Sequence, residues 1–173
     1  MKKLNNRVGF IKQSATVILV YISRFGMLPP NISPLGSFGF FGQNIFLYFL
    51  TIILFDFLKG GFYSGFLFTY LGFFSYWFFG KIAKTQKRQF FLLPLASFTF
   101  FLISNLGVWW YWYPHTVSEL LTCYILAVPF YKNTLIGDLF FGYGFLSFKI
   151  LAKFVANRKI ENRLNSKVLT SIQ

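Results

Sequence analysis

Acidic side chains are scarce in this chain, which has only four Asp or Glu among 173 residues but 17 Lys or Arg. Charged residues make up 12% of the sequence, whereas a soluble domain carries roughly 25%. Because 55% of the residues are hydrophobic and the mean hydropathy is +0.56, the composition excludes a soluble globular domain. It predicts an integral membrane protein whose function lies within the membrane-embedded helices or at their ends.

Cysteine and histidine are nearly absent, with Cys123 and His115 the single examples of each. A lone cysteine forms no intramolecular disulfide, and no Cys/His cluster has the spacing of a zinc site, so we expect no metal and no cofactor. The sequence also lacks G-x-S-x-G, H-E-x-x-H and a glycine-rich phosphate loop. We therefore expect the protein not to be an enzyme.

The basic residues gather in three parts of the chain instead of forming a nucleic-acid-binding surface interleaved with aromatics, so we expect no nucleic-acid partner. Fourteen of the 17 lie in these parts: Lys2, Lys3, Arg7, Lys12, Lys81, Lys84, Lys87, Arg88, Lys149, Lys153, Arg158, Lys159, Arg163 and Lys167. By the positive-inside rule the three parts are cytoplasmic, so both termini lie inside and the number of spans is even. We expect a multi-pass protein of the bacterial inner membrane.

Apolar runs separated by proline, glycine and charged stretches predict six membrane spans in one all-α domain. A hydrocarbon core of roughly 30 Å requires about 20 helical residues, which this length allows about six times. The predicted spans cover residues 8–28, 35–42, 45–57, 62–80, 90–108 and 134–154, followed by a basic cytoplasmic tail, 155–173. The second and third spans are shorter than a full crossing. Residues 115–130 are interpreted as an outer or re-entrant helix, or a shallow connection.

Ionisable residues inside predicted spans indicate a candidate site, because each is costly in a membrane unless it has a partner or faces water. Arg24, Asp56 and Asp138 fall in the outer third of three different spans and can converge on an outward-facing pocket. In such a pocket Arg24 suits an anionic or carbonyl group, and the aspartates suit a cationic or hydrogen-bond-donating group. The alternative is an ion-pair network that only holds the helices together.

Asn105 and Trp109 lie four residues apart, so they share one helix face and can present an amide and a ring to one ligand. The alternative is that Asn105 links helices and that Trp109 and Trp110 belong to an interfacial aromatic belt. The residues predicted to line the pocket are Arg24, Asn31, Asp56, Asn105, Trp109, Trp110, Asn133 and Asp138. The balanced charge of the outer side favours a zwitterionic, neutral or weakly cationic solute.

Several phrases resemble a family of uncharacterised bacterial membrane proteins over roughly residues 20–145. The phrases are Arg24 followed by LPPNISPLGSFGFFG (28–42), ILFDF (53–57), FFLISNLGVWW through YPHT (100–116), and CYILAVPFYKNTLIGDLFFG (123–142). That family in turn is similar to the substrate-binding S components of energy-coupling-factor (ECF) vitamin transporters. The similarity lies in the proline-broken first loop, the short second and third spans, and the proline and lysine before the last span.

The resemblance implies a six-helix S-component-like bundle that captures a small, vitamin-like solute from the outer side. It also implies docking on a membrane coupling subunit with two ATPases. The same general fold resembles the membrane scaffold of the cell-wall elongation machinery, which transports nothing and is the alternative function. A stand-alone proton-linked transporter that uses Asp56 or Asp138 is a third possibility.

Overall fold

The computed structural model describes residues 17–18, 21, 28–42 and 44–172 of the chain, and side chains as far as residue 158. These residues form five helices, α2 (Leu35–Phe41), α3 (Ile45–Leu58), α4 (Phe66–Ile82), α5 (Gln86–Trp112) and α6 (Val117–Ile172). The expected all-α architecture is therefore confirmed. The predicted first span, 8–28, lies almost wholly outside the described residues, so the sixth helix of the bundle stays a prediction.

Helices α3 and α5 begin where side chains replace missing backbone partners. The Asn44 side chain accepts a hydrogen bond from the Leu47 N–H at the start of α3, and Thr85 accepts one from the Arg88 N–H at the start of α5. Such caps satisfy donors that have no partner within the helix. Helices α3, α4 and α5 correspond to the predicted spans at 45–57, 62–80 and 90–108. The observed boundaries differ from the predicted ones by up to four residues.

The prediction of a separate element before a last span at 134–154 is wrong. Helix α6 runs without interruption from Val117 to Ile172 and contains Pro129 in its interior. Proline removes one helical hydrogen bond, but a membrane helix tolerates this loss when neighbouring groups compensate. The apolar sequence on both sides of Pro129 therefore continues as one helix, and the basic tail expected at 155–173 extends it.

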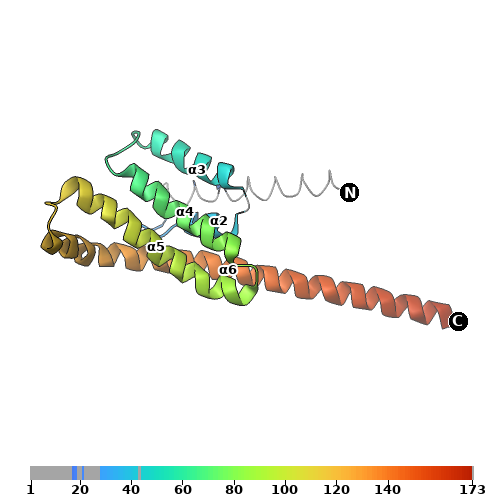
Figure 1. The fold of residues 1–173 in the computed structure, drawn as a ribbon. Helices are drawn as coiled ribbons and strands as arrows, with labels where there is room; N and C mark the ends of the chain where they lie inside the picture. Colours follow the sequence, from blue (N-terminus) through green and yellow to red (C-terminus); the bar gives the residue numbers. More distant parts are fainter. Residues whose placement is uncertain (1–16, 19–20, 22–27, 43, 173) are drawn as a thin grey trace.

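Helix α2 occupies the position of the predicted second span, 35–42, but it is not a crossing helix. Its seven residues rise only about 10 Å, a third of the hydrocarbon thickness. Its buried residues are Leu35, Gly36, Ser37, Phe38, Gly39 and Phe40. The apolar run is therefore buried by other helices of the protein. Figure 1 shows α2 against α4 and α6.

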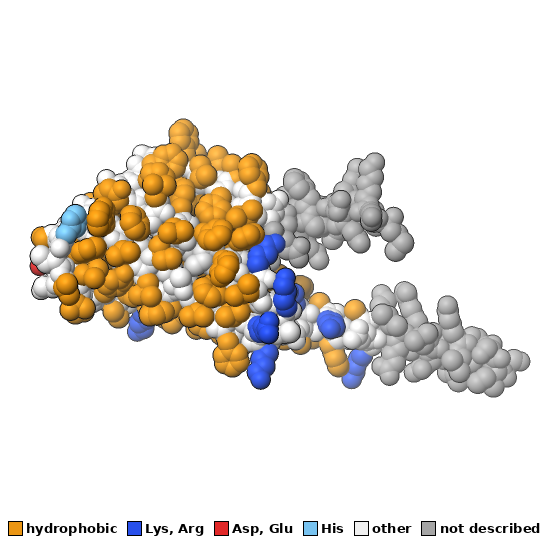
Figure 2. All heavy atoms as spheres, in the orientation of Figure 1, with side chains coloured by type: hydrophobic (Ala, Val, Ile, Leu, Met, Phe, Trp, Pro, Cys, Tyr) orange, Lys and Arg blue, Asp and Glu red, His pale blue; other side chains and the backbone are white. Residues whose placement is uncertain are grey.

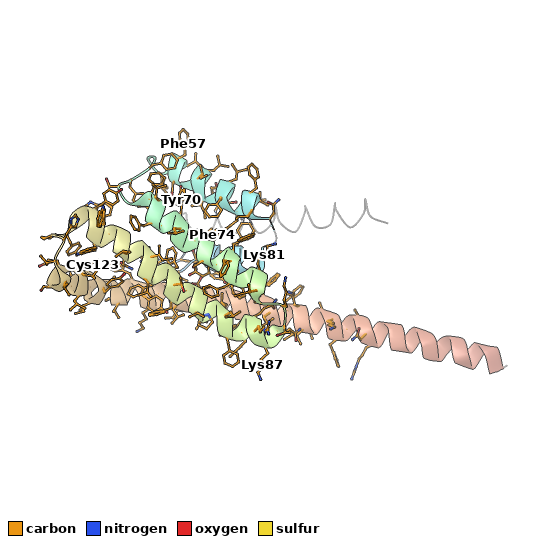
Figure 3. All side chains as sticks on the ribbon, viewed as in Figure 1. Phe57, Tyr70, Phe74, Lys81, Lys87 and Cys123 are labelled. Atoms are coloured by element: carbon orange, nitrogen blue, oxygen red, sulfur yellow. The ribbon has the colours of Figure 1, made fainter. Side chains whose placement is uncertain are left out.

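Helices α4, α5 and α6 run side by side, with α3 on the far side of α4 (Figure 1). The α3–α4 and α5–α6 turns lie toward one end of the molecule, which we call the turn end. Lys81 and Lys87 mark the opposite end, where α6 projects beyond the other helices (Figure 3). We call it the basic end, because Lys and Arg side chains gather there in Figure 2.

The surface is largely hydrophobic, as the orange side chains over the helices in Figure 2 show. Phe46, Phe57 and Phe140 are each at least 70% exposed, and many other Leu, Ile and Phe side chains are also exposed. Helix α5 and the Val117–Arg158 part of α6 are long and apolar enough to cross a membrane. Apolar patches this extensive are rare on water-soluble monomers and are typical of surfaces that contact a membrane or another protein.

Aromatic rings fill the space between α3 and the helices beside it. Tyr48 of α3 is 1% exposed and packs edge-on against Phe38 of α2 and Phe73 of α4, with ring centroids 5.6 and 6.3 Å apart. The approach of α2 to α4 is closer and depends on Gly80, where a side chain would overlap the Phe40 carbonyl oxygen. Backbone thus packs directly on backbone where α2 meets α4 at Gly80, whereas rings fill the space beside Tyr48.

The cap at the start of α3 gives a first testable expectation. Asn44→Ala removes the acceptor for the Leu47 N–H, 3.2 Å away, and should destabilise the protein by about 1 kcal/mol. A loss of this size lowers Tm by about 2–4 °C in a chain of this length. Thermal unfolding in mild detergent measures it. Asn44→Asp keeps an acceptor and should retain the wild-type Tm, and equal losses in both variants would contradict the capping role.

Candidate functional site

A cavity of about 400 Å³ lies between the segment before α2 and helices α3, α4, α5 and α6. Its lining residues are Leu28, Pro29, Pro30, Asn31, Ile32, Ser33, Leu35, Gly36, Phe55, Asp56, Tyr63, Thr69, Phe73, Tyr76, Phe100, Thr134 and Asp138. Pro29, Pro30, Asn31 and Tyr63 are exposed, whereas Leu35, Tyr76 and Asp138 are buried. The cavity is therefore open at one side and closed at the other, and its size falls within the range of small-molecule sites.

Asp138 forms part of the closed side and is only 2% exposed. The Tyr76 hydroxyl of α4 donates a short hydrogen bond to its carboxylate Oδ2. The Ser37 hydroxyl of α2 donates to the Asp138 backbone oxygen at 2.9 Å. Helices α2, α4 and α6 are thus joined at this one residue, which fixes the carboxylate at the inner wall of the cavity.

Asp138 lies deeper than its sequence position suggested. It was expected within about two turns of the outer end, but α6 begins at Val117, so Asp138 is about 31 Å along the helix. The contacts between α5 and α6 give its level: the Tyr131 ring packs on Phe98, and the Tyr143 hydroxyl donates to the Phe90 oxygen. Asp138 of α6 therefore lies at about the level of the middle of the neighbouring helix α5. The expectation was wrong because it placed the start of the last helix at residue 134.

Asp56 stands near the C-terminal end of α3 and is half-buried. The Tyr70 hydroxyl of α4 donates to its Oδ2 at 2.9 Å. Figure 3 shows Tyr70 on the part of α4 that lies beside α3. Both carboxylates of the cavity are therefore held by tyrosines of α4, one near the turn end and one in the interior.

The segment between Pro29 and Pro34 has no helical structure, yet it lies against the side of α6. The Asn133 side-chain amide donates to the Pro30 oxygen at 3.2 Å, about 24 Å along α6 from Val117. Asn31 adopts a left-handed conformation with φ 66°, which asparagine tolerates better than most residues. Two prolines prevent a helix here, so the backbone of this segment forms one wall of the cavity.

Of the predicted site residues, Asn31, Asp56 and Asp138 line the cavity, and Asn133 holds the segment that forms its wall. Arg24 lies outside the described residues, and so does the predicted network between it and the aspartates. Asn105, Trp109 and Trp110 are not among the lining residues. The Asn105 side-chain amide donates to Phe101 O, one turn earlier in α5, at 2.8 Å.

The aromatic cluster after Asn105 packs on itself near the α5–α6 turn. His115 stacks on Trp110, with centroids 4.7 Å apart and planes inclined by 22°, and its Nε2 lies 2.8 Å from the Trp110 oxygen. Trp110 is 51% exposed. This arrangement agrees with the interfacial belt that was the alternative for these residues.

Sequence reasoning missed the tyrosines that hold the two carboxylates. Tyr70 and Tyr76 lie in a run of phenylalanines. No spacing rule distinguishes them from the other tyrosines among the ten in the chain. Their six-residue separation places them about 9 Å apart along α4, which matches carboxylates at two depths. Among the described residues, no group of three or more His, Cys, Asp or Glu has the arrangement of a metal site.

Comparison with known proteins gives a family but no described activity. No curated protein and no solved structure matches the chain. Residues 4–160 match a family described as a family of unknown function (DUF6580). Because the match spans most of the 173 residues, the chain belongs to this family.

Proposed function

We propose that the protein captures a small solute from the outer side of the bacterial inner membrane, as a substrate-binding component of an uptake transporter. The observation that carries the proposal is the cavity of about 400 Å³. It has aromatic walls and a few polar groups, the composition typical of small-molecule sites. The proposed activity is binding and transfer of a solute without chemical change.

The distribution of charge supports an outward-facing opening. Lys81, Lys84, Lys87 and Arg88 lie in or beside the α4–α5 connection at the basic end, which the positive-inside rule places in the cytoplasm. The turn end then faces outward. Asp56 and Tyr63, which line the cavity, lie at the α3–α4 turn and thus on the outer side.

The broken segment before α2 supports a binding site in the membrane. Backbone without helical hydrogen bonds is tolerated at membrane depth only where protein buries it or where it lines a water-filled cavity. Discontinuous helices of this kind surround the substrate in many transporters. The segment from Pro29 to Pro34 followed by the short α2 fits this pattern. The six-helix S-component-like bundle and a coupling subunit with ATPases are further parts of the proposal.

A scaffold of the cell-wall elongation type is the second candidate, because both carboxylates already have tyrosine partners. A scaffold needs satisfied polar groups and a closed interior. The open cavity favours solute capture over this candidate. A stand-alone proton-linked transporter shares the cavity, and pH-dependent uptake in vesicles without ATP would distinguish it.

Filling the cavity tests the proposed function. Thr69→Trp places a large ring at a half-buried lining position of α4, whereas Leu71→Trp, two residues on, replaces a side chain that is 54% exposed. Native mass spectrometry of wild-type protein, purified from its own membranes, should find a bound solute of a few hundred daltons. Thr69→Trp should lose most of that mass, and Leu71→Trp should retain it.

Two results would count against solute capture. One is the absence of any bound small molecule in wild-type protein, together with co-purification of cell-wall elongation proteins. The other is a solute that both tryptophan variants retain equally, because it would then lie outside the cavity. Both variants should elute from size exclusion as the wild type does, which separates loss of binding from loss of folding.

A further inference from the structure

We infer that the solute carries a protonated amine, which donates N–H hydrogen bonds to Asp138 at the inner wall of the cavity. This inference rests on the proposed function and adds the chemical class of the ligand. Three features of the lining carry it: the sign of its charge, the balance of its hydrogen-bonding groups and the position of its rings.

The described lining has two carboxylates, Asp56 and Asp138, and includes no lysine, arginine or histidine. A tyrosine hydroxyl donates to each carboxylate, and the buried Ser97 hydroxyl is a further neutral hydrogen-bonding partner of Asp138. A carboxylate has about four acceptor positions, so these neutral partners leave others available. A carboxylate in such a setting attracts a cation, because burial makes unpaired charge costly.

Several donors of the cavity lining are already used within the protein. Pro29 and Pro30 have no backbone N–H. The Ile32 N–H donates to the Pro29 oxygen, and the Leu35 N–H donates to Ser33 Oγ. The Thr134 hydroxyl donates to the Phe130 oxygen within α6. These donors are therefore not available to a ligand, whereas the carboxylate oxygens of Asp56 and Asp138 offer lone pairs, which suit N–H groups.

Hydroxyls of the lining lead to the same conclusion. The Tyr76 hydroxyl donates its only hydrogen to Asp138, so its remaining lone pairs can only accept. An ammonium group has three donors and no acceptor. It can therefore bond to the Asp138 carboxylate and the Tyr76 oxygen together. An alcohol or a carboxylic acid has a single O–H donor, so it can bond to only one of these acceptors.

Aromatic rings surround the path to Asp138. Phe73 of α4 and Phe100 of α5 both line the cavity, and their ring centroids are 4.7 Å apart. The Phe55 ring of α3 also lines the cavity, but Lys59 Nζ already lies 6.0 Å from its centroid, so we assign the cation-stabilising role to Phe73 and Phe100. Rings stabilise a cation through their faces and also bury an apolar body. The fitting ligand is therefore an amine on a compact apolar or aromatic body, with Asp56 attracting it near the opening.

Matched probe sets test this class directly. Each set carries one terminal amine, alcohol or carboxylate on the same skeleton: phenylethyl, indolylethyl, imidazolylethyl or cyclohexylethyl. Binding to the full-length protein in nanodiscs is measured by calorimetry and by the ligand-dependent rise in Tm. At least one amine should bind about tenfold or more tightly than its alcohol and carboxylate partners, since a charge-assisted hydrogen bond contributes about 1.5–3 kcal/mol.

Side-chain variants locate the amine. Asp138→Asn keeps the size of the side chain and an acceptor for the Tyr76 hydroxyl, and it should weaken amine binding by about tenfold or more. Asp56→Asn, nearer the opening, should weaken it less. Glu119→Gln is the matched control, because it removes one negative charge in the first turn of α6 and outside the cavity lining, and it should leave amine affinity unchanged.

The outcomes separate this inference from the proposed function. Tighter binding of an alcohol or carboxylate probe, lost in Thr69→Trp, would overturn the amine while leaving solute capture intact. Equal amine affinity in Asp138→Asn and Glu119→Gln would overturn the assignment to Asp138. If no amine binds, the inference is overturned; if native mass spectrometry also detects no solute, the proposed function is overturned with it.

Discussion

Gly80→Ala should lower Tm by roughly 2–12 °C in mild detergent, the largest loss of stability expected from any single added methyl group in the described helices. A Cβ at Gly80 would overlap the Phe40 carbonyl oxygen and lie 2.7 Å from its carbonyl carbon. These are backbone atoms of α2, so no side-chain rotation relieves the overlap and the two helices must separate. Overpacking of this kind costs about 1–3 kcal/mol. Thermal unfolding followed by circular dichroism measures the loss.

Gly144→Ala is the matched control for this substitution. A Cβ at Gly144, which lies on α6, meets nothing within 4 Å. Alanine is also the better helix former by about 1 kcal/mol, so this variant should match or exceed the wild-type Tm. A similar fall in both variants would show that helix propensity or expression dominates, and would remove the close contact between α2 and α4 as the explanation.

Gly36→Ala should weaken solute binding by about tenfold or more, at a smaller cost in stability than Gly80→Ala. A Cβ there would overlap Asp138 Oδ1 and lie 2.6 Å from Tyr76 Cε1, both of which are side-chain atoms that face the cavity. Side chains can move where backbone cannot, and the free space available to them is the cavity itself. The mutation therefore displaces the carboxylate and reduces the space for a ligand.

Native mass spectrometry and calorimetry with the best-binding probe measure this effect. Binding should fall by about tenfold or more, as expected for loss of a charge-assisted contact. Gly144→Ala again serves as the control and should bind normally. If Gly36→Ala bound the probe with wild-type affinity while its Tm fell as far as that of Gly80→Ala, Gly36 would have only a packing role.

The helix positions follow from local signals in the sequence. Prolines 29, 30 and 34 end the first apolar run, and Asn44 and Thr85 cap the helices that follow them. These residues act on their own neighbours, which is why single-sequence reasoning found α3, α4 and α5. Pro129 was misinterpreted by the same reasoning, because its effect in α6 depends on the surrounding helices and not on its neighbours in sequence.

The candidate site was predicted in part, for a similar reason. Asp56 and Asp138 stand out as charges in apolar runs, and both line the cavity. Asn105 and Trp109 share a helix face, but shared faces do not specify what lies opposite, and the Asn105 amide bonds to its own helix. Tyr70 and Tyr76 become recognisable only when α3 and α6 bring the carboxylates beside them.

The length of α6 has a mechanical consequence. Asp138 lies within an unbroken helix that continues for a further 34 residues, or about 51 Å, to Ile172. A rigid rod amplifies rotation in proportion to its length, so a tilt of about 5° at Asp138 displaces the far end by about 4 Å. The continuous helix thus links the depth of the cavity to a point well past the other helices, so a small tilt at Asp138 would move that distant end by about the length of one residue.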